Sequence, residues 1–252
     1  MSVQDHFSGV AQAYAVARPD YPAALFDALA AHVPASAHVW EPGCGSGQAT
    51  RDLAARFAHV HATDPSAKQL AQHWASDARV DNATLTVEPG ERTWLIDASV
   101  DLVAVAQALH WFDVPAFFTE CDRVLRPGGV LAAWGYDDFD VSPDMADAVA
   151  SFRDRIEADW PPERAFIKRH YADFDWPFER IDAPPLTLAV DWNFERFIGY
   201  LSSFSAGVQH RARTGEDAVE LHRDALREAW GDPVRVRRIT WPLFLHLRHK
   251  PA

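Results

Sequence analysis

The spacing of hydrophobic positions divides the chain into two parts. Before residue 135, short apolar runs alternate with segments in which apolar residues recur every three or four positions, as along one face of a helix. Strands are expected at 38–40, 59–64, 83–88, 100–109 and 130–134, and helices at 6–17, 22–29, 51–57, 65–74 and 114–125. The run at 100–109 is apolar on both faces, which is typical of a central parallel strand. This alternation predicts an α/β fold with a mostly parallel sheet and helices on both faces.

After Trp134 the regular alternation of strands and helices ends. Helices are expected at 145–160, 194–205 and 217–230, with an irregular aromatic segment at 161–176. Residues 186–192 and part of 236–247 alternate like strands, and these two could close the sheet as an antiparallel pair. The helices between them are expected to form a cap over the substrate.

A glycine-rich turn follows the first expected strand, in the sequence H-V-W-E-P-G-C-G-S-G-Q-A-T. A strand, a glycine turn and a helix together present free backbone N–H groups, and glycine permits a ligand to approach the backbone closely. A dinucleotide-binding turn would have a third glycine where Gln48 stands. The carboxylate of Glu41, two positions before Gly43, suits a cationic ligand group better than a pyrophosphate. A structural turn between strand and helix, or a different nucleotide site, is the alternative.

Three further candidate site residues stand at the ends of expected strands. Asp64 lies about 20 residues beyond the glycine turn, where an acidic residue at the end of the second strand meets ribose hydroxyls. Its alternative role is a helix N-cap. His110 and Trp111 follow the central strand at the end where ligands of open α/β sheets collect. Here the alternatives are that His110 caps the strand end and that Trp111 packs under the next helix.

The pattern E-x-G-x-G-x-G that begins at Glu41 resembles the first motif of class I S-adenosylmethionine-dependent methyltransferases. The sequence R-V-L-R-P-G-G-V-L at 123–131 is also characteristic of this family, where it ends a helix and leads into a strand. The resemblance implies a Rossmann-like fold with a seven-stranded, mostly parallel sheet and a C-terminal helical cap. It implies a single domain over residues 1–252, in which residues 1–134 bind the cofactor and residues 135–252 supply the cap and the closing strands.

Three segments resemble the trans-aconitate methyltransferase-like (methyltransferase type 11) branch of this family. They are Y-x-x-x-R-P-x-Y-P at 14–22, A-Q-A-L-H-W-F at 106–112 and Y-L-S-S-F-S-A at 200–206. In the last segment Phe204 replaces the tryptophan of the branch and Ser203 replaces its threonine, so the substrate is not inherited with the motif. The resemblance implies S-adenosylmethionine-dependent methylation of a small molecule, with a carboxylate as one candidate acceptor.

The resemblance also assigns the residues that would hold S-adenosylmethionine. The cofactor-binding candidates are Tyr14, Arg18, Glu41, Gly43, Cys44, Gly45, Gly47, Asp64, Pro65, Glu91, Ala106 and Gln107. In the family, aromatic and arginine side chains from before the first strand close over the cofactor, whose carboxylate suits bidentate pairing with arginine. A surface arginine with packed tyrosines is the alternative for that segment, and a solvated turn is the alternative for Glu91.

Whether a catalytic base is needed depends on the acceptor. A carboxylate acceptor loses no proton, whereas a hydroxyl, amine or carbon acid benefits from a base. His110 is the best candidate because an imidazole titrates near neutrality. Tyr14 and Tyr21 are alternative hydrogen-bonding groups at the reacting centre.

Composition narrows the remaining function classes. The net charge of −12 and the lack of a basic tract argue against nucleic acid and anionic membranes as partners. No apolar run approaches the roughly 20 residues that span a bilayer, no signal peptide is evident, and Cys44 and Cys121 do not form a disulfide framework, so a cytoplasmic location is expected. His59 and His61 have too few companions to predict a metal site.

Two other functions remain open. A nicotinamide-dependent oxidoreductase is disfavoured by Gln48 and Glu41, while a cofactor-binding protein without transfer activity would keep the same motifs. The sequence leaves the substrate and the oligomeric state undetermined.

Overall fold

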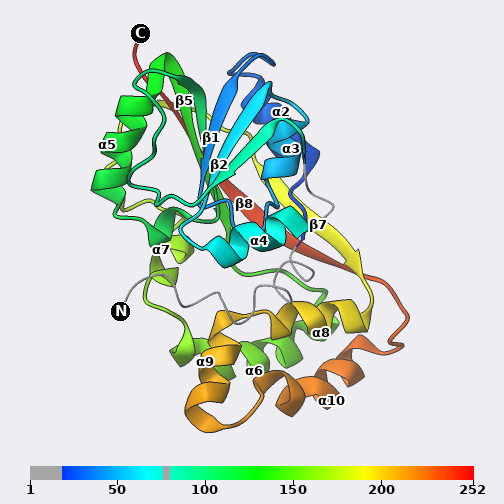
Figure 1. Cartoon of the computed structure of the whole chain (residues 1–252). Helices are drawn as coiled ribbons and strands as arrows, with labels where there is room; N and C mark the ends of the chain where they lie inside the picture. The colour runs from blue at the N-terminus through cyan, green and yellow to red at the C-terminus, as the bar shows by residue number, and fades with distance from the viewer. Residues whose placement is uncertain (1–18, 76–79) are drawn as a thin grey trace.

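The computed structural model describes residues 19–75 and 80–252. Within these residues a twisted sheet carries helices on both faces, and a group of helices gathers at one end of the sheet (Figure 1). The helix expected at 6–17 lies outside the described residues, as do Tyr14 and Arg18. No helix of the described part is long and apolar enough to cross a bilayer.

The sheet follows the order β3-β2-β1-β4-β5-β8-β6, and β7 also pairs with β8. The strands are β1 (His38–Pro42), β2 (His59–Thr63), β3 (Ala83–Thr86), β4 (Val100–Ala106), β5 (Leu125–Tyr136), β6 (Glu179–Ile181), β7 (Leu186–Trp192) and β8 (Arg237–His249). Strands β1 to β5 are parallel to one another, and β8 runs antiparallel to β5. The predicted α/β fold and the antiparallel closing pair are therefore confirmed.

The described residues form eight strands where seven were expected. One closing strand was predicted before β8, but β6 and β7 are separate and pair with different parts of it. Ile181 of β6 lies opposite Leu247, whereas Leu186 of β7 lies opposite Leu243. Pro184 and Pro185 stand between the two strands, and proline cannot donate a hydrogen bond to a neighbouring strand, so the pairing is interrupted there.

Helices cover the two faces of the sheet because alternate residues of each strand point to opposite sides. Val39 of β1 packs in one core cluster with α2 (Ala23–Ala30), α3 (Thr50–Ala54) and α4 (Ala67–Ala75). Trp40 packs on the other side, in a cluster that includes residues of α5 (Val114–Val124) and α7 (Arg164–Lys168). As predicted, α2 buries Leu25, Phe26 and Leu29.

The cap has a separate aromatic core. Its helices are α6 (Ala146–Ile156), α8 (Phe194–Ser202), α9 (Ser205–Thr214) and α10 (Ala218–Trp230), which lie together at one end of the sheet in Figure 1. Phe152, Phe197 and Trp230 are fully buried among them. The helix expected at 194–205 stops at Ser202, and a second helix begins at Ser205. The segment expected to be irregular at 161–176 contains α7.

Candidate active site

A first cavity opens at the carboxyl ends of β1, β2 and β4, where ligands of open α/β sheets bind. Of the predicted site residues, its lining includes Tyr21, Glu41, Gly43, Cys44, Gly45, Asp64, Pro65, Ala106 and Gln107. Sequence reasoning missed other lining residues, among them Gln69 on α4 and Tyr136 at the end of β5. Five segments that are separate in the sequence thus meet at one cavity.

The glycines of the turn are required by backbone conformation and by close packing. Gly43 has φ +69°, and a Cβ atom there would lie 2.7 Å from the Cβ of Ala108. Gly47 has φ +91°, and a Cβ atom there would lie 2.4 Å from Nε2 of His73. L-residues with side chains rarely adopt these φ values. Gly47 therefore shapes the turn against α4, and it is not among the residues that line the cavity.

Glu41 places an unusual carboxylate in the first cavity. The residue is 1% exposed, and its Oε2 accepts a 2.6 Å hydrogen bond from Oγ1 of Thr50. Its Oε1 is buried and has no hydrogen-bond partner in the described part of the chain. Burial raises the pKa of Glu41 to about 8, while the Thr50 hydrogen bond acts to lower it. A ligand that brings a cationic donor to Oε1 would satisfy this oxygen and favour the ionised carboxylate.

Asp64 ties the glycine turn to the start of α4. Its Oδ2 accepts a 3.0 Å hydrogen bond from the amide of Gly45, and its Oδ1 accepts a 2.8 Å bond from the amide of Ser66. Burial raises the pKa of Asp64, and these two amide bonds oppose the rise. The turn-forming role and the ligand-facing role are compatible, because the residue also lines the cavity. Nearby, Oε1 of Gln69 is buried without a partner among the described residues and could accept a hydrogen bond from a ligand.

Gln107 fixes the boundary of the first cavity. Its Nε2 donates to the carbonyl oxygen of Tyr136, and its Oε1 accepts from the amide of Tyr136, both at 2.9 Å. The residue has φ +52°, which is rare for a side chain other than glycine. A Cβ atom at Gly135 would lie 2.5 Å from Oε1 of Gln107, so glycine is needed beside this clamp.

A second cavity shares Gln107, Trp111 and Tyr136 with the first. Its other lining residues are His110, Asp137, Asp138, Phe139, Trp160, Pro161, Arg164, Ile167, Tyr200, Ser203, Phe204 and Ser205. The sequence identified His110 and the segment at 200–206. It gave no signal for a role of Asp137, which follows β5, of Trp160, which precedes the aromatic segment, or of Arg164 in α7.

Arg164 carries the positive charge of the second cavity. A terminal nitrogen of Arg164 lies 3.0 Å from Oδ1 of Asp137 and 2.8 Å from Oδ1 of Asp138. The guanidinium carbon lies 3.9 Å from the centre of the Trp160 ring, in a cation–π contact. Nε of Arg164 is buried without a partner among the described residues. The cavity therefore offers aromatic surface together with an N–H donor that remains to be satisfied.

His110 lines the second cavity and is 7% exposed. Its Nδ1 lies 2.9 Å from the hydroxyl of Tyr171. Burial lowers the pKa of His110 to about 3, so the imidazole is neutral over the physiological range. Its predicted role as a base stays a prediction, and this low pKa makes it a weak proton acceptor.

Glu91 lies away from both cavities. Its Oε1 accepts a 2.8 Å hydrogen bond from the amide of Asp113, immediately before α5. The residue lines a shallow surface depression together with Arg92 and Trp94. The contact of Glu91 with the cofactor therefore remains a prediction from the resemblance alone.

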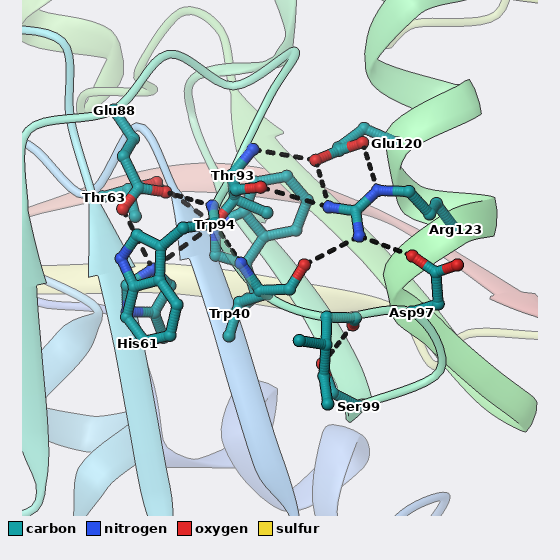
Figure 2. Close-up of polar contacts among 12 residues, drawn as sticks. Trp40, His61, Thr63, Glu88, Thr93, Trp94, Asp97, Ser99, Glu120 and Arg123 are labelled. Atoms are coloured by element: carbon teal, nitrogen blue, oxygen red, sulfur yellow. Dashed lines mark hydrogen bonds and ion pairs between the residues drawn. The ribbon is translucent and has the colours of Figure 1, made fainter.

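A polar network holds the loop after β3 against α5 (Figure 2). Arg123 donates to the carbonyl oxygen of Leu95 at 2.7 Å and to Asp97 at 2.8 Å, and Glu120 accepts a 2.8 Å bond from the amide of Thr93. This loop contains Gly90, where a Cβ atom would lie 2.9 Å from the ring of Phe112. Because Phe112 lines the first cavity, the network supports one of its walls.

Among residues 19–75 and 80–252, no three His, Cys, Asp or Glu side chains are grouped so that they could hold a metal ion.

Comparison with known proteins agrees with this architecture. A family model described as a methyltransferase domain matches residues 40–133. A solved structure from Anaeromyxobacter dehalogenans, named as a type II methyltransferase, is 41% identical, with a TM-score of 0.85. The alignment covers 93% of this chain and 98% of that one. The chain belongs to the methyltransferase family.

Curated relatives of this methyltransferase are more distant. A Dictyostelium discoideum protein named as a methyltransferase is 29% identical over 255 residues, covering 98% of this chain and 95% of the relative. A Saccharomyces cerevisiae protein named as an S-adenosylmethionine-dependent methyltransferase is 31% identical over 135 residues, covering 52% of this chain and 45% of the relative.

Proposed function

We propose that this methyltransferase uses S-adenosylmethionine to methylate a small molecule and belongs to the trans-aconitate methyltransferase-like branch. The observation that carries the proposal is the unpartnered Oε1 of Glu41, buried beside the glycine turn. A pyrophosphate has no hydrogen to donate to this oxygen, whereas the ammonium group of S-adenosylmethionine would donate to it and favour the ionised carboxylate. The same reasoning disfavours a nicotinamide cofactor.

Other residues of the first cavity complete the proposed cofactor site. Asp64 and Gln69 can accept hydrogen bonds from hydroxyl or amine groups, while Cys44, Pro65, Ala106 and Gln107 supply walls. When bound, the cofactor supplies an electrophilic methyl group on a sulfonium ion. Tyr14 and Arg18 are proposed to cover it, as the resemblance implies.

The methyl acceptor is proposed to occupy the second cavity. The linings of the two cavities share Gln107, Trp111 and Tyr136, so the two cavities are neighbours and this proposal places the acceptor next to the cofactor. Aromatic walls keep water from the reacting atoms, and alignment of the two reactants can lower a barrier by roughly 7–11 kcal/mol in favourable cases.

A carboxylate is the acceptor class that we propose. Its oxygen can take a methyl group without losing a proton, which suits a cavity whose histidine is a weak proton acceptor. Nε of Arg164 offers an unused donor for such an anion. Asp137 and Asp138 already pair with this arginine, so they would have to share it with the substrate.

Thermal unfolding with S-adenosylmethionine, S-adenosylhomocysteine and NAD added separately tests the cofactor. Ligand at a hundred times its Kd stabilises by about 2.7 kcal/mol, which corresponds to a rise in Tm of roughly 5–10 °C for a domain of this size. We expect this rise with both adenosyl sulfur compounds and not with NAD. The Glu41→Gln variant keeps the side-chain shape but loses the charge, and its rise should be much smaller.

A rise with NAD alone, or with none of the three ligands, would overturn the proposal. Methyl transfer to a panel of small carboxylic acids then separates an enzyme from a cofactor-binding protein without transfer activity. A protein that binds the cofactor but methylates neither these acids nor matched alcohols and amines would belong to the second class.

A further inference from the structure

His110 in the second cavity forms a hydrogen bond with Tyr171, a residue that no sequence motif indicated. Tyr171 follows α7, is 61 residues away in the sequence and is completely buried. Its hydroxyl lies 2.9 Å from Nδ1 of His110. The Tyr171 ring is packed against Phe174 and Phe244, with ring centres 5.3 and 5.0 Å apart. The hydroxyl is thus held in a fixed position behind the imidazole.

The backbone around Tyr171 is strained. His170 and Tyr171 have φ values of +51° and +57°, in the left-handed region that residues with bulky side chains seldom occupy. Two hydrogen bonds hold this conformation: His246 Nε2 donates to the His170 carbonyl at 2.7 Å, and Trp176 Nε1 donates to the Tyr171 carbonyl at 3.1 Å. Strain of this kind persists where the surroundings impose it, and it is concentrated at functional sites.

The direction of the hydrogen bond follows from the surroundings of the two groups. Burial raises the pKa of Tyr171, so the phenol keeps its hydrogen. The backbone amide of His110 also interacts with the phenol oxygen and opposes this rise in pKa. Nδ1 of His110 is the hydrogen-bond partner of the phenol among the described residues. The phenol therefore donates to Nδ1. In a neutral imidazole the single hydrogen then resides on Nε2.

Nε2 is the ring nitrogen left for a ligand. The side chain of His110 lines the second cavity, and its Nδ1 is already engaged by the Tyr171 hydroxyl. Charged groups on the same cavity are Arg164, Asp137 and Asp138. A protonated Nε2 can donate a hydrogen bond to an oxygen of a carboxylate, and Arg164 supplies positive charge in the same cavity.

We propose that Tyr171 holds His110 as the Nε2–H tautomer, and that His110 donates a hydrogen bond to an oxygen of the methyl acceptor instead of removing a proton. This inference rests on the proposed function, because it places the acceptor in the second cavity. Tyr171 is a positioning residue that acts through His110. As a carboxylate oxygen forms its bond to the methyl carbon, the carbon–sulfur bond breaks and its electron pair stays on sulfur. No proton leaves the acceptor, and Nε2 keeps its hydrogen.

Nitrogen-15 NMR of histidine side chains tests the tautomer without any substrate. The whole chain is labelled at its histidines, and the His110 signals are identified by their loss in His110→Gln. We expect a protonated Nε2 and an unprotonated Nδ1 that stay unchanged between about pH 5 and pH 8. In Tyr171→Phe the two tautomers should mix. Protonated Nδ1 in the wild type, or titration near neutrality, would overturn the proposal whether or not Tyr171→Phe folds.

Activity of two His110 variants separates a donor from a base. The amide N–H of Gln can replace the donor but cannot replace a base, whereas Ala replaces neither. With trans-aconitate or benzoate as acceptor, we expect His110→Gln to stay within about tenfold of wild-type kcat/KM and His110→Ala to lose roughly 10–100-fold. Equal losses of roughly 10²–10⁴-fold in both variants would overturn the proposal.

The Tm rise with S-adenosylhomocysteine separates this inference from the proposed function. Both His110 variants and Tyr171→Phe should keep the wild-type rise, because these residues lie outside the first cavity. If the rise is present but alcohols or amines are methylated and carboxylates are not, the donor role fails while the cofactor assignment stands. If the rise is absent in the wild type, the proposed function fails.

Discussion

The two cavities of this methyltransferase are built in different ways. The first is organised around a glycine turn after β1 and the residues that follow β2 and β4. The second is lined by residues that follow β4 and β5, by residues of the segment 160–167 and by residues of the cap. A site made of a glycine turn and strand ends has its residues at fixed spacings, so its motifs can be found in the sequence. A site made of distant segments depends on how these segments pack, and motif spacing does not predict this.

Their charges also differ. In the first cavity Oε1 of Glu41 has no partner among the described residues. In the second, the guanidinium of Arg164 already pairs with Asp137 and Asp138, and His110 is neutral. The first cavity thus contains an oxygen that could accept a hydrogen bond from a cationic group, whereas the second offers aromatic surface and a few hydrogen-bonding groups.

The largest expected effect is on the free energy of unfolding and comes from Glu41, the buried carboxyl group of the first cavity. Its pKa is raised from 4.5 to about 8, so the folded protein keeps a proton that the unfolded chain releases. Without ligand, the associated stability is fully present below about pH 4.5, decreases as pH rises and is lost above about pH 8. The total is roughly 3–5 kcal/mol, and Glu41→Gln should lack this decrease.

Urea unfolding of wild type and Glu41→Gln across this pH range measures the difference. The variant should be the more stable of the two at pH 8, although it binds the cofactor less well. Parallel pH profiles of the two proteins would show that Glu41 is already ionised in the folded state, and the contrast between the cavities would then fail.

A somewhat smaller effect compares glycines of the two regions. Gly43→Ala should destabilise by about 2–4 kcal/mol, because the left-handed backbone and the 2.7 Å approach to Ala108 both resist a Cβ atom. Gly207 in α9 has open space around its Cβ position and is the matched control. Gly207→Ala should stabilise by about 0.5–1 kcal/mol. Urea unfolding measures both, and equal effects would contradict the close packing of the turn.

The smallest expected change in stability comes from a substitution in the cap, Asp159→Ala. Asp159 accepts a 2.8 Å hydrogen bond from His210 and two 2.7 Å bonds from Arg213. Asp159→Ala leaves the buried His210 without this partner and should destabilise by about 1–3 kcal/mol, with no change in the Tm rise given by S-adenosylhomocysteine. Glu195→Gln, which breaks an exposed pair with Arg223, is the control and should change stability by less than about 1 kcal/mol. A loss of cofactor binding in Asp159→Ala would mean that the cavities are coupled.

The sequence predicted the sheet and most helices because their signals are local. The buried run at 100–109 became β4, and the strands expected at 186–192 and within 236–247 became β7 and β8. Interruptions were harder to predict. The break at Ser203 within the helix expected at 194–205 and the additional strand β6 depend on which neighbour each short segment meets.

The site residues show the same contrast between local signals, which were predicted, and tertiary packing, which was not. Glu41, Gly43 and Asp64 were predicted from motif spacing, and all three line the first cavity. Gly47 was also predicted there, but its missing side chain makes room for His73, which no spacing rule indicates. Arg164 lies in a segment without regular hydrophobic spacing, so nothing local marked it.

The sequence by itself determined the α/β fold and identified many of the residues that line the first cavity, because glycine turns, strand ends and hydrophobic periods act over a few neighbouring residues. Only the tertiary structure decided which side chains meet in the second cavity. The pairing of His110 with Tyr171 joins residues 61 positions apart, and it depends on α7 packing against the sheet and on a strained turn. Burial then lowers the pKa of the histidine, and burial is a property of the assembled core that no local pattern contains.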